Sequence, residues 1–240
     1  MDGGYFVRRI EFFHRKYFKS HTLTAEHMTA ILLYLVNRHQ KSLHRNELYR
    51  IFYYDAPPFE GQLRFPVSDP DLVGGPRTKN FKRDERVIRQ QEFHTILNTT
   101  RKVAIRMGEL ATSKNWLLNA DAQEQLLKSE KQVSDLLPND FHVDIQQKGV
   151  DTRLGIDIAN LTFHKFVDTI VLVASDADFA PAAKLARIYG VDVVLDPLFG
   201  NVAKSLESHI DGKKSYDMVR KLSKLLNAKP QPEPKWWADS

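Results

Sequence analysis

The sequence predicts an α/β protein built around a parallel sheet. Residues 169–174 form a short apolar run rich in β-branched side chains, which is typical of a strand buried on both faces. Residues 191–195 form a second such run. Between them, an amphipathic pattern with Pro181 in its first turn and Gly190 just past its end predicts a short helix. Strand, helix and strand in this order predict a right-handed βαβ unit with parallel strands.

Length and composition limit the class of protein. A chain of 240 residues suits one large domain, or a domain with a small appendage. The sequence contains no cysteine, which excludes disulfides and thiolate metal sites. It also shows no signal-peptide core and no apolar run of membrane-spanning length. We therefore expect a cytoplasmic protein with no membrane contact.

Charge is distributed unevenly along the chain. Residues 61–120 contain 11 lysines and arginines and 6 aspartates and glutamates, whereas residues 121–180 contain 5 and 11. A basic block beside an acidic one is consistent with a polyanion-binding surface next to a cation site. Ordinary solvated faces are the alternative, and charge alone would favour them.

The remaining elements follow from apolar periodicity and from turn residues. Helices are predicted at residues 8–19, 24–37, 82–98, 151–164, 201–210 and 214–227. Further strands are predicted at residues 47–54, 102–107, 116–118 and 141–147.

Three segments are predicted to be irregular. Residues 59–80, rich in Pro and Gly, are expected to form a long loop. Residues 122–137 are predicted to be a helix or part of a flexible insertion. The Pro-rich tail at residues 229–237 is expected to be extended or disordered, with two tryptophans that dock onto a partner or back onto the same chain.

Four aspartates stand at predicted junctions of strands, loops and helices. Asp176 and Asp178 follow the strand at residues 169–174, Asp151 begins a helix, and Asp2 precedes two glycines that allow close approach to a ligand. Parallel sheets bind ligands beyond the carboxyl ends of their strands. Converging carboxylates repel one another unless a hard cation such as Mg²⁺ or Mn²⁺ joins them. Such an ion activates water for attack on a phosphodiester.

Each acidic residue also has a purely structural interpretation. Asp178 is placed to cap a helix, and Asp151 suits the positive end of a helix dipole. Asp2 could belong to a disordered terminus. Asp157 lies in mid-helix and points away from Asp151, so we expect a solvated or supporting role for it. Asp176 is harder to explain structurally, because Asp178 already provides a cap. Their joint placement favours a site.

Other chemistries find less support in the sequence. The histidines lack zinc-site spacing, and there is no Gly-x-Ser-x-Gly or Gly-x-Gly-x-x-Gly motif. Residues 211–215 resemble the end of a phosphate loop but lack its upstream glycine. A phosphatase with an Asp-x-Asp pair is a third, weaker hypothesis, because the residues around Asp176 do not match that motif.

Five motifs occur in an order that resembles NYN-domain proteins of the PIN-like nuclease superfamily. They are Asp-Gly-Gly-Tyr at 2–5, Tyr-Tyr-Asp-Ala-Pro at 53–57, Val-Ala-Ile-Arg-Met-Gly at 103–108, Gln-Lys-Gly-Val-Asp at 147–151 with Asp157, and Val-Ala-Ser-Asp-Ala-Asp-Phe at 173–179. The resemblance implies a PIN-like central parallel sheet flanked by helices in three layers. It implies an NYN domain at residues 1–211, with an insertion around residues 59–140. Residues 212–240 would then hold a C-terminal helix and the tail.

The resemblance also implies an activity, which is metal-dependent cleavage of RNA. Carried over motif by motif, the residues that hold Mg²⁺ or Mn²⁺ are Asp2, Asp151, Asp176 and Asp178, with Asp157 as a less secure fifth. The sequence departs from the family at one point, because a buried strand precedes the first aspartate in the family and only Met1 precedes Asp2 here. Either the chain begins too late or another segment fills that place. A non-catalytic RNA-binding or regulatory module with a degraded site is the alternative function.

RNA is the expected partner, with DNA as the alternative. The residues predicted to steer its backbone are Lys148, Arg153, Arg77, Lys79, Lys82 and Arg83, for each of which plain solubility is the competing interpretation. Tyr5 and Phe179 could stack on bases, although Phe179 also suits a core. The C-terminal tail could serve a homo-oligomer or a protein partner.

Overall fold

The structure, a computed structural model, describes residues 1–44, 47–71 and 74–237. The chain folds as two compact units. Unit 1 comprises Met1–Asp55, Glu92–Gly108 and the chain from Gly149 onward, and unit 2 comprises Ala56–Gln91 and Glu109–Lys148. Within the described ranges, no helix is both long enough and apolar enough to cross a membrane.

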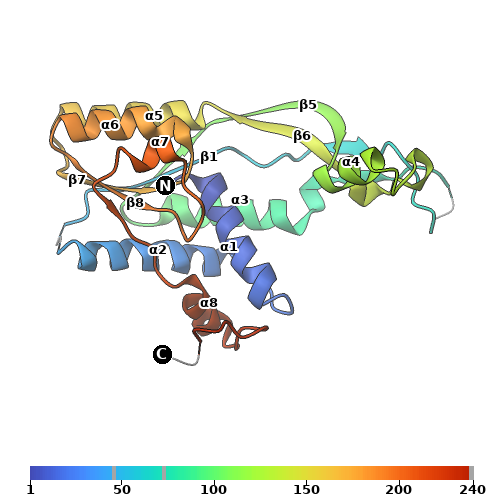
Figure 1. Ribbon diagram of the computed structural model, residues 1–240, viewed down its shortest axis with the longest axis horizontal. Helices are drawn as coiled ribbons and strands as arrows, with labels where there is room; N and C mark the ends of the chain where they lie inside the picture. Colours follow the sequence, from blue (N-terminus) through green and yellow to red (C-terminus); the bar gives the residue numbers. More distant parts are fainter. Residues whose placement is uncertain (45–46, 72–73, 238–240) are drawn as a thin grey trace. The chain divides into compact units, whose positions relative to one another are not determined.

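Unit 1 contains the predicted parallel strands (Figure 1). Strand β1 (Ile51–Asp55) pairs in parallel with β4 (Val103–Met107). Strand β7 (Thr169–Val173) pairs in parallel with β8 (Asp192–Asp196), which also pairs with the short β9 (Gly212–Lys213). The βαβ prediction is confirmed, because helix α6 lies between β7 and β8 in sequence. The ladders form separate two-stranded and three-stranded sheets rather than one uninterrupted central sheet.

The first two residues touch both of these sheets. The nitrogen of Met1 donates to the carbonyl of Phe52 at 2.8 Å, and the nitrogen of Tyr54 donates to the carbonyl of Met1 at 3.0 Å. On the other side, the nitrogen of Asp2 donates to the carbonyl of Val173 at 3.0 Å. Met1 and Asp2 therefore occupy the position of a very short strand between β1 and β7.

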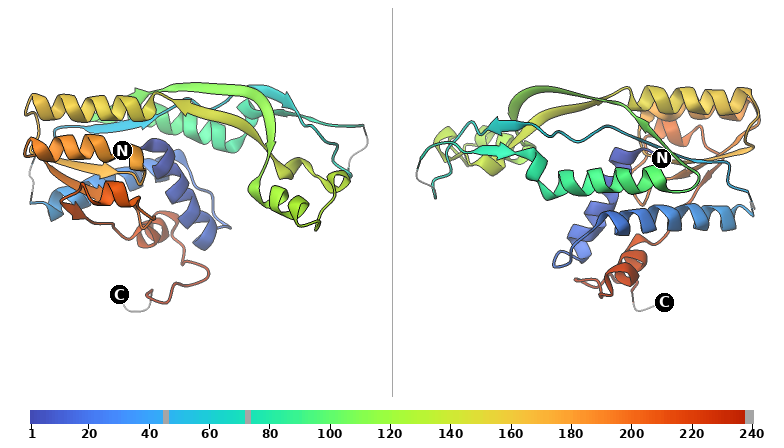
Figure 2. Two further views of the ribbon diagram at one scale, coloured as in Figure 1. Left: turned by 45° about the horizontal axis from the view of Figure 1, so that its top comes forward. Right: turned by 180° about the vertical axis from the view of Figure 1, so that it is seen from behind.

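Helices cover the strands of unit 1. They are α1 (Gly3–Tyr17), α2 (Ala25–Ser42), the second half of α3 (Glu85–Thr99), α5 (Val150–Phe163), α6 (Ala180–Ile188), α7 (Lys204–Glu207) and α8 (Met218–Leu226). Helices α5 and α6 lie side by side on one face of β7 and β8, and α2 lies on the other face (Figures 1 and 2). Thr24 caps α2, in a reciprocal capping box with His27.

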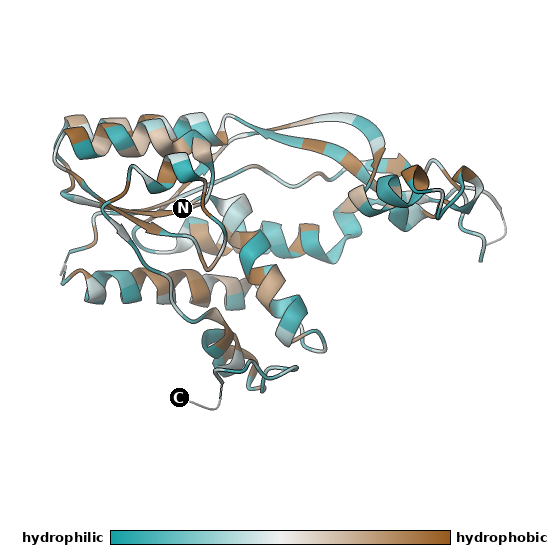
Figure 3. Cartoon of the chain, in the orientation of Figure 1, coloured by the Kyte–Doolittle hydropathy of each residue, from teal (hydrophilic) through white to brown (hydrophobic). Residues whose placement is uncertain are grey.

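The main hydrophobic core of unit 1 lies among α1, α2, α3, α8 and β1. Phe6 stacks on Phe93 and meets Tyr53 edge-on, with ring centroids 6.1 and 6.4 Å apart. Met218 and Leu222 of α8 are fully buried in the same core. Apolar colouring is concentrated on β7 and β8 and along part of α2 (Figure 3). The sheet and its flanking helices therefore hold the strand ends in fixed positions.

Unit 2 consists of two antiparallel strand pairs and short helices. Strand β2 (Gln62–Arg64) pairs with β3 (Thr78–Asn80), so the predicted loop at 59–80 is wrong in part. Three-residue strands give too little alternation to be recognised in sequence. The second pair joins β5 (Glu109–Leu118) to β6 (Phe141–Lys148), and α4 (Ala120–Leu127) follows β5.

Several predicted element boundaries are wrong by a few residues. The first helix begins at Gly3 instead of residue 8, and α2 continues to Ser42. The strand predicted at 47–54 is β1 at 51–55, and the two C-terminal helices are shorter than predicted. In the tail, the nitrogen of Gln231 donates to the carbonyl of Tyr17, and Trp237 packs against the core. The tail thus contacts its own chain.

Candidate functional site

The carboxyl ends of β1 and β7 carry several acidic residues of unit 1. Strand β1 ends at Asp55, and the chain beyond β7 reaches Asp176 and Asp178. Asp2 lies between the two strands, held by the hydrogen bond to Val173. Three segments that are far apart in sequence thus supply carboxylates at the same end of the parallel strands.

Asp2 is an ordered part of this site and not a loose terminus. It is the N-cap of α1, and its Oδ1 accepts a hydrogen bond from the nitrogen of Tyr5 at 3.0 Å. Burial, which disfavours the charged form, raises the pKa of Asp2, and the nearby Asp55 carboxylate raises it further. Asp2 would therefore gain from a neighbouring cation.

The first of the two glycines after Asp2 is required by packing. Gly3 and Gly4 are the first residues of α1. A Cβ on Gly3 would lie 2.6 Å from the ring of Tyr53 and 2.7 Å from the carbonyl oxygen of Tyr54. Glycine at position 3 therefore lets α1 begin directly against β1.

Asp151 lies within electrostatic range of the other three predicted acidic residues. It lies in the first turn of α5, two residues after Gly149, which adopts a left-handed φ of 74°. Partial burial raises the pKa of Asp151, and the charges of Asp2, Asp176 and Asp178 raise it further. The four carboxylates are thus close enough to influence one another electrostatically.

The roles expected of Asp176 and Asp178 as helix caps are reversed. Asp176 is the N-cap of a short 3₁₀ turn, Ala177–Phe179, and its Oδ1 accepts a hydrogen bond from the nitrogen of Asp178 at 3.1 Å. The chain enters a 3₁₀ turn before α6 begins, and this places the cap two residues earlier than periodicity suggests. Asp178 itself is exposed in this turn.

Asp157 has neighbours of its own in the structure. Its Oδ2 accepts hydrogen bonds from the hydroxyl of Tyr54 and from Nε of Arg106, both at 2.9 Å. Arg106 in turn lies over the ring of Phe52, 5.3 Å from its centroid. Asp157 thus joins α5 to β1 and β4, and it is not among the residues that raise the pKa of Asp151.

A further carboxylate near the site, Asp55, was not predicted from the sequence. This residue is fully buried, and its Oδ2 lies 2.9 Å from Nε2 of His94 and accepts a 3.4 Å hydrogen bond from the hydroxyl of Tyr53. Its position at the end of a predicted strand was a usable signal. The partner His94 lies on α3, 39 residues away in sequence, so no local sequence pattern predicts this contact.

The donor set suits a hard cation. All four predicted ligands are carboxylates, which Mg²⁺ and Mn²⁺ prefer. Burial raises the pKa of Asp2 and of Asp151, and neighbouring carboxylates raise both pKa values further. In the part of the chain that the structure describes, no three acidic or histidine side chains already converge on a single point. Mg²⁺ usually retains several waters, which reduces the number of direct protein ligands it needs.

An open depression lies beside the acidic residues. Its volume is about 510 Å³, and it is lined by Asp151, Thr152, Gly155, Asp178, Pro181, Ala182 and Leu185. These residues come from the start of α5, from the 3₁₀ turn that contains Asp178, and from α6, which packs against α5. The depression is a place where a substrate could contact Asp151 and Asp178.

The predicted RNA-contacting residues are divided between the units. Arg153 is in unit 1, on the first turns of α5, and the other five are in unit 2. Arg77 pairs with Asp69 and Lys79 with Asp84, both at 2.9 Å. Lys82 and Arg83 are exposed in the 3₁₀ turn that follows β3, and Lys148 ends β6.

The two aromatic residues predicted to stack on bases are buried instead. Tyr5 is 7% exposed, and its hydroxyl donates a short hydrogen bond to the carbonyl of Pro197. Phe179 is 1% exposed, in agreement with its alternative interpretation as a core residue. Base stacking by either residue would require the core to open.

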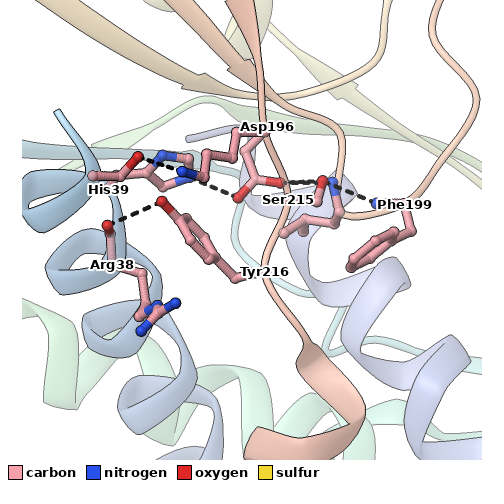
Figure 4. Close-up of polar contacts among 9 residues, drawn as sticks. Arg38, His39, Asp196, Phe199, Ser215 and Tyr216 are labelled. Carbon is pink, nitrogen blue, oxygen red and sulfur yellow. Dashed lines mark hydrogen bonds and ion pairs between the residues drawn. The ribbon is translucent and has the colours of Figure 1, made fainter. Parts of the chain in front are cut away.

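Asp196, at the end of β8, is held in a separate polar network (Figure 4). Its Oδ2 lies 2.8 Å from Nε2 of His39, and its Oδ1 accepts hydrogen bonds from Ser215 Oγ at 2.7 Å and from the nitrogen of Leu198 at 2.9 Å. Asp196 is fully buried and both its oxygens have partners. This carboxylate therefore fixes the chain after β8 and does not belong to the open acidic group.

The chain resembles two known proteins over about half of its length. The chain is 26% identical over 124 residues to the uncharacterized protein MJ0482 of Methanocaldococcus jannaschii, covering 50% of this chain and 49% of that protein. The chain thus spans about half the length of this curated relative. A protein of unknown function from Vibrio parahaemolyticus, VPA0982, aligns in structure with a TM-score of 0.26 and 15% identity, covering 50% of this chain and 74% of the other, which is too weak to support an argument.

The sequence profile of the NYN domain matches residues 78–211. This range contains Asp151, Asp157, Asp176 and Asp178, and it covers more than half of the chain. The chain therefore belongs to the NYN domain family of the PIN-like nuclease superfamily.

Proposed function

We propose that this protein is a metal-dependent ribonuclease whose carboxylates Asp2, Asp151, Asp176 and Asp178 hold Mg²⁺ or Mn²⁺. Membership of the NYN family supports a nuclease, because the family consists generally of ribonucleases. The observation that carries the proposal is the placement of Asp2, Asp176 and Asp178 at the carboxyl ends of the parallel strands, near enough to Asp151 at the start of α5 for their charges to act on it. RNA as substrate and a cytoplasmic location remain predictions from the sequence.

Each residue contributes differently to the proposed site. A bound divalent ion supplies activation of water and neutralises charge on the leaving oxygen. Asp2 is held in place by its N-cap hydrogen bond, and Asp176 by its own cap, so neither carboxylate has to be ordered when substrate binds. Asp55, fixed by His94, adds negative charge beside Asp2. Asp157 connects α5 to β1 and β4 through its hydrogen bonds with Tyr54 and Arg106.

The finer fold assignment belongs to the same proposal. We interpret β4, β1, the Met1–Asp2 segment, β7, β8 and β9 as one PIN-like central parallel sheet in a three-layer α/β/α domain. The hydrogen bonds of Met1 and Asp2 to both flanking strands support this interpretation. The NYN domain would then extend over residues 1–211, with the insertion around residues 59–140 and the C-terminal helix and tail at 212–240.

The decisive test is cleavage of end-labelled single-stranded RNA with and without Mn²⁺ or Mg²⁺. Asp176→Asn keeps the side-chain oxygen that caps the 3₁₀ turn and removes only the charge, so the fold should be preserved. We expect cleavage that requires metal in the wild type, and a loss of at least about 100-fold in the variant, the scale of losing one electrostatic contribution to catalysis. Asp217→Asn, at the cap of α8 outside the acidic group, is the matched control and should cleave normally.

The second candidate function is an RNA-binding module without catalysis. The exposed Lys82 and Arg83 in unit 2 favour RNA binding independently of the acidic group. This function predicts RNA binding that is unchanged by Asp176→Asn, together with no cleavage at any enzyme concentration. That combination of results would replace the ribonuclease proposal.

A further inference from the structure

The chain beyond β8 places an exposed aromatic ring beside the acidic group of unit 1. In the parallel β7–β8 ladder, the last residues of the two strands pair with each other. Asp176 follows the end of β7 and Phe199 follows the end of β8 at the same distance in sequence. The nitrogen of Ala203 donates to the carbonyl of Ser175 at 3.2 Å, so the segment after β8 returns to the end of β7. Phe199, within this segment, is 60% exposed.

Tyr5 of α1 connects the same segment to Asp2. The nitrogen of Tyr5 donates to Oδ1 of Asp2 at 3.0 Å, and its hydroxyl donates a short hydrogen bond to the carbonyl of Pro197. A Cβ on Gly200 would overlap the hydroxyl oxygen of Tyr5, so glycine at this position lets the chain pass directly over that hydroxyl. The side chain of Tyr5 thus reaches from Asp2 to the two residues that flank the Leu198–Phe199 pair.

The backbone of Leu198 and Phe199 adopts an unfavourable conformation. Their φ angles are 45° and 57°, in the left-handed region that residues with a Cβ rarely adopt. Strain of this kind persists only where surrounding groups fix it, and it is concentrated at functional sites. Leu198 is fully buried, so apolar burial holds the first residue of the pair, whereas the side chain of the second is presented to solvent.

Side chains from α1, from the end of β8 and from the segment after β9 hold this backbone in place. Oδ1 of Asp196 accepts a hydrogen bond from the nitrogen of Leu198 at 2.9 Å. Oγ of Ser215 accepts one from the nitrogen of Phe199 at 3.2 Å (Figure 4). Nε and Nη2 of Arg9 donate to the carbonyl of Leu198 at 3.1 and 2.9 Å. The network around Asp196 therefore fixes the main chain that carries an exposed ring.

A second exposed ring, that of Phe12 on α1, belongs to the same patch. Phe12 is 40% exposed. The buried ring of Phe13 meets Phe12 and Phe199 edge-on, with centroids 5.4 and 6.5 Å apart. The guanidinium carbon of Arg9 lies 4.8 Å from the centroid of Phe12 and 5.1 Å from that of Phe13. Phe12 and Phe199 therefore flank one buried ring and form an aromatic patch that includes a guanidinium.

Positive charge lies on both sides of Phe12 along α1. Arg8 and Lys16 are exposed, and Nζ of Lys16 lies 5.7 Å from the centroid of Phe12. Residues four apart in a helix share a face, so Arg8, Phe12 and Lys16 form one stripe. Burial raises the pKa of Asp2 and the charge of Arg8 opposes this rise, which places Arg8 close to the acidic group. The stripe therefore runs away from the acidic group as cation, ring and cation.

We propose that Phe199 and Phe12 form a stacking platform for unpaired bases of a single-stranded RNA, with Arg8 and Lys16 contacting its phosphates. Aromatic rings stack on any base and cations attract the backbone, which is how proteins hold single-stranded nucleic acid without reading its sequence. The bases of a double helix are already stacked on one another and are not available to these rings. The inference rests on the ribonuclease proposed above, and adds that its substrate is single-stranded and extends from the acidic group along α1.

The test measures binding of a fluorescein-labelled single-stranded RNA, and of the corresponding RNA duplex, to the full chain. Fluorescence anisotropy is recorded in EDTA to remove divalent metal. Phe199→Ala should weaken binding of the single strand by about 5- to 150-fold, the range for loss of one base-stacking contact, and leave binding of the duplex unchanged. Phe199→Trp keeps a stacking surface and should bind the single strand at least as tightly as the wild type.

Two further variants complete the series. Phe12→Ala, in a regular part of α1, should also weaken binding of the single strand alone. Phe163→Ala is the matched control, because Phe163 is 54% exposed but ends α5, at the opposite end of that helix from Asp151. It should bind both RNAs as the wild type does. Thermal unfolding of each variant establishes that the fold is retained.

Two results would overturn the proposal. Equal affinity of wild type, Phe199→Ala and Phe12→Ala for the single strand, or no binding by any of them, would show that these rings do not hold bases. If the same substitutions abolished self-association, the patch would be a protein contact instead. Equal losses for single strand and duplex would show that the substitutions disturb a general polyanion surface.

The binding assay and the cleavage assay fail independently. Metal-dependent cleavage with unchanged affinity in Phe199→Ala and Phe12→Ala would overturn the stacking platform and leave the ribonuclease in place. Selective loss of single-strand binding in these variants, with no cleavage by the wild type at any enzyme concentration, would support the platform and replace the ribonuclease with the RNA-binding module.

Discussion

At the scale of single residues, Asp151 combines partial burial with three neighbouring carboxylates. Its pKa is raised above the ordinary value of 3.8. The folded state therefore holds a proton in the pH range just above 3.8 where the unfolded state has released it, and folding stability falls as the pH rises through that range. Asp151→Asn should remove this contribution, giving a shallower loss of stability from pH 4 to pH 7 in urea unfolding.

The control for this prediction is Asp192→Asn. Asp192 begins β8 and thus lies at the amino end of the strand, away from the acidic group. It should retain the wild-type dependence of stability on pH. A parallel profile for Asp151→Asn and wild type would mean that the four carboxylates do not interact as the structure indicates.

Asp157 is expected to support the fold rather than bind metal. Removing its carboxylate takes a hydrogen-bond acceptor away from the hydroxyl of Tyr54 and from Nε of Arg106. Tyr54 is only 3% exposed. Asp157→Ala should lower the free energy of unfolding by about 1–3 kcal/mol, the usual cost of an unsatisfied buried group. Tyr54→Phe in the Asp157→Ala background should recover part of this loss, because it removes the stranded hydroxyl.

The measurement is chemical denaturation of the two single variants and the double variant, analysed as a double-mutant cycle. Additive effects of the two substitutions would show that the hydrogen bond between Tyr54 and Asp157 is not formed. In the presence of Mn²⁺, the increase in Tm should be the same for Asp157→Ala and wild type. A lost increase would instead identify Asp157 as a metal ligand.

At the scale of elements, the start of α5 depends on one glycine. Gly149 has a φ of 74°, a conformation that costs an L-residue about 1–2 kcal/mol. Gly149→Ala should therefore lower the free energy of unfolding by about that amount and displace Asp151, with a loss of metal-dependent stabilisation. Gly155→Ala is the matched control in the same helix, because a Cβ there meets no atom within 4 Å.

The two substitutions should change stability in opposite directions. Alanine at 155 should raise the free energy of unfolding by about 0.5–1 kcal/mol, since glycine is unfavourable inside a helix. Thermal unfolding of both variants, with and without Mn²⁺, provides the measurement. A stabilising effect of Gly149→Ala would contradict the left-handed conformation at the start of α5.

The elements of the βαβ unit could be predicted from the sequence because their signals are local. The apolar runs at 169–174 and 191–195, Pro181 and Gly190 all act within a few residues. The pairing of Met1 and Asp2 with β1 and β7 could not be predicted, because it joins residues more than 50 positions apart. Asp176 and Asp178 could be predicted from the end of a strand, and Asp151 from the start of a helix. The contact between Asp55 and His94 could be seen only in the folded chain.

At the scale of the whole molecule, the two units differ in the size of their cores. The main apolar cluster, which includes Phe6, Leu32 and Leu222, lies entirely in unit 1. The buried hydrophobic residues described in unit 2 are only Ala56, Val87, Ala122, Leu136 and Val143. Because burial of apolar surface supplies most folding free energy, unit 2 should open more readily than unit 1.

Native-state hydrogen exchange would measure this difference. We expect the amides that pair β5 with β6 to exchange through an opening of lower free energy than those that pair β7 with β8. The β5–β6 ladder is the longer of the two, although its register shifts between Thr112 and Trp116. Mild denaturant should reduce protection in unit 2 first, while the carboxylates of unit 1 keep their arrangement. Matching opening free energies in the two ladders would instead mean that the chain unfolds as one cooperative structure, with unit 2 stabilised by contacts beyond its own small core.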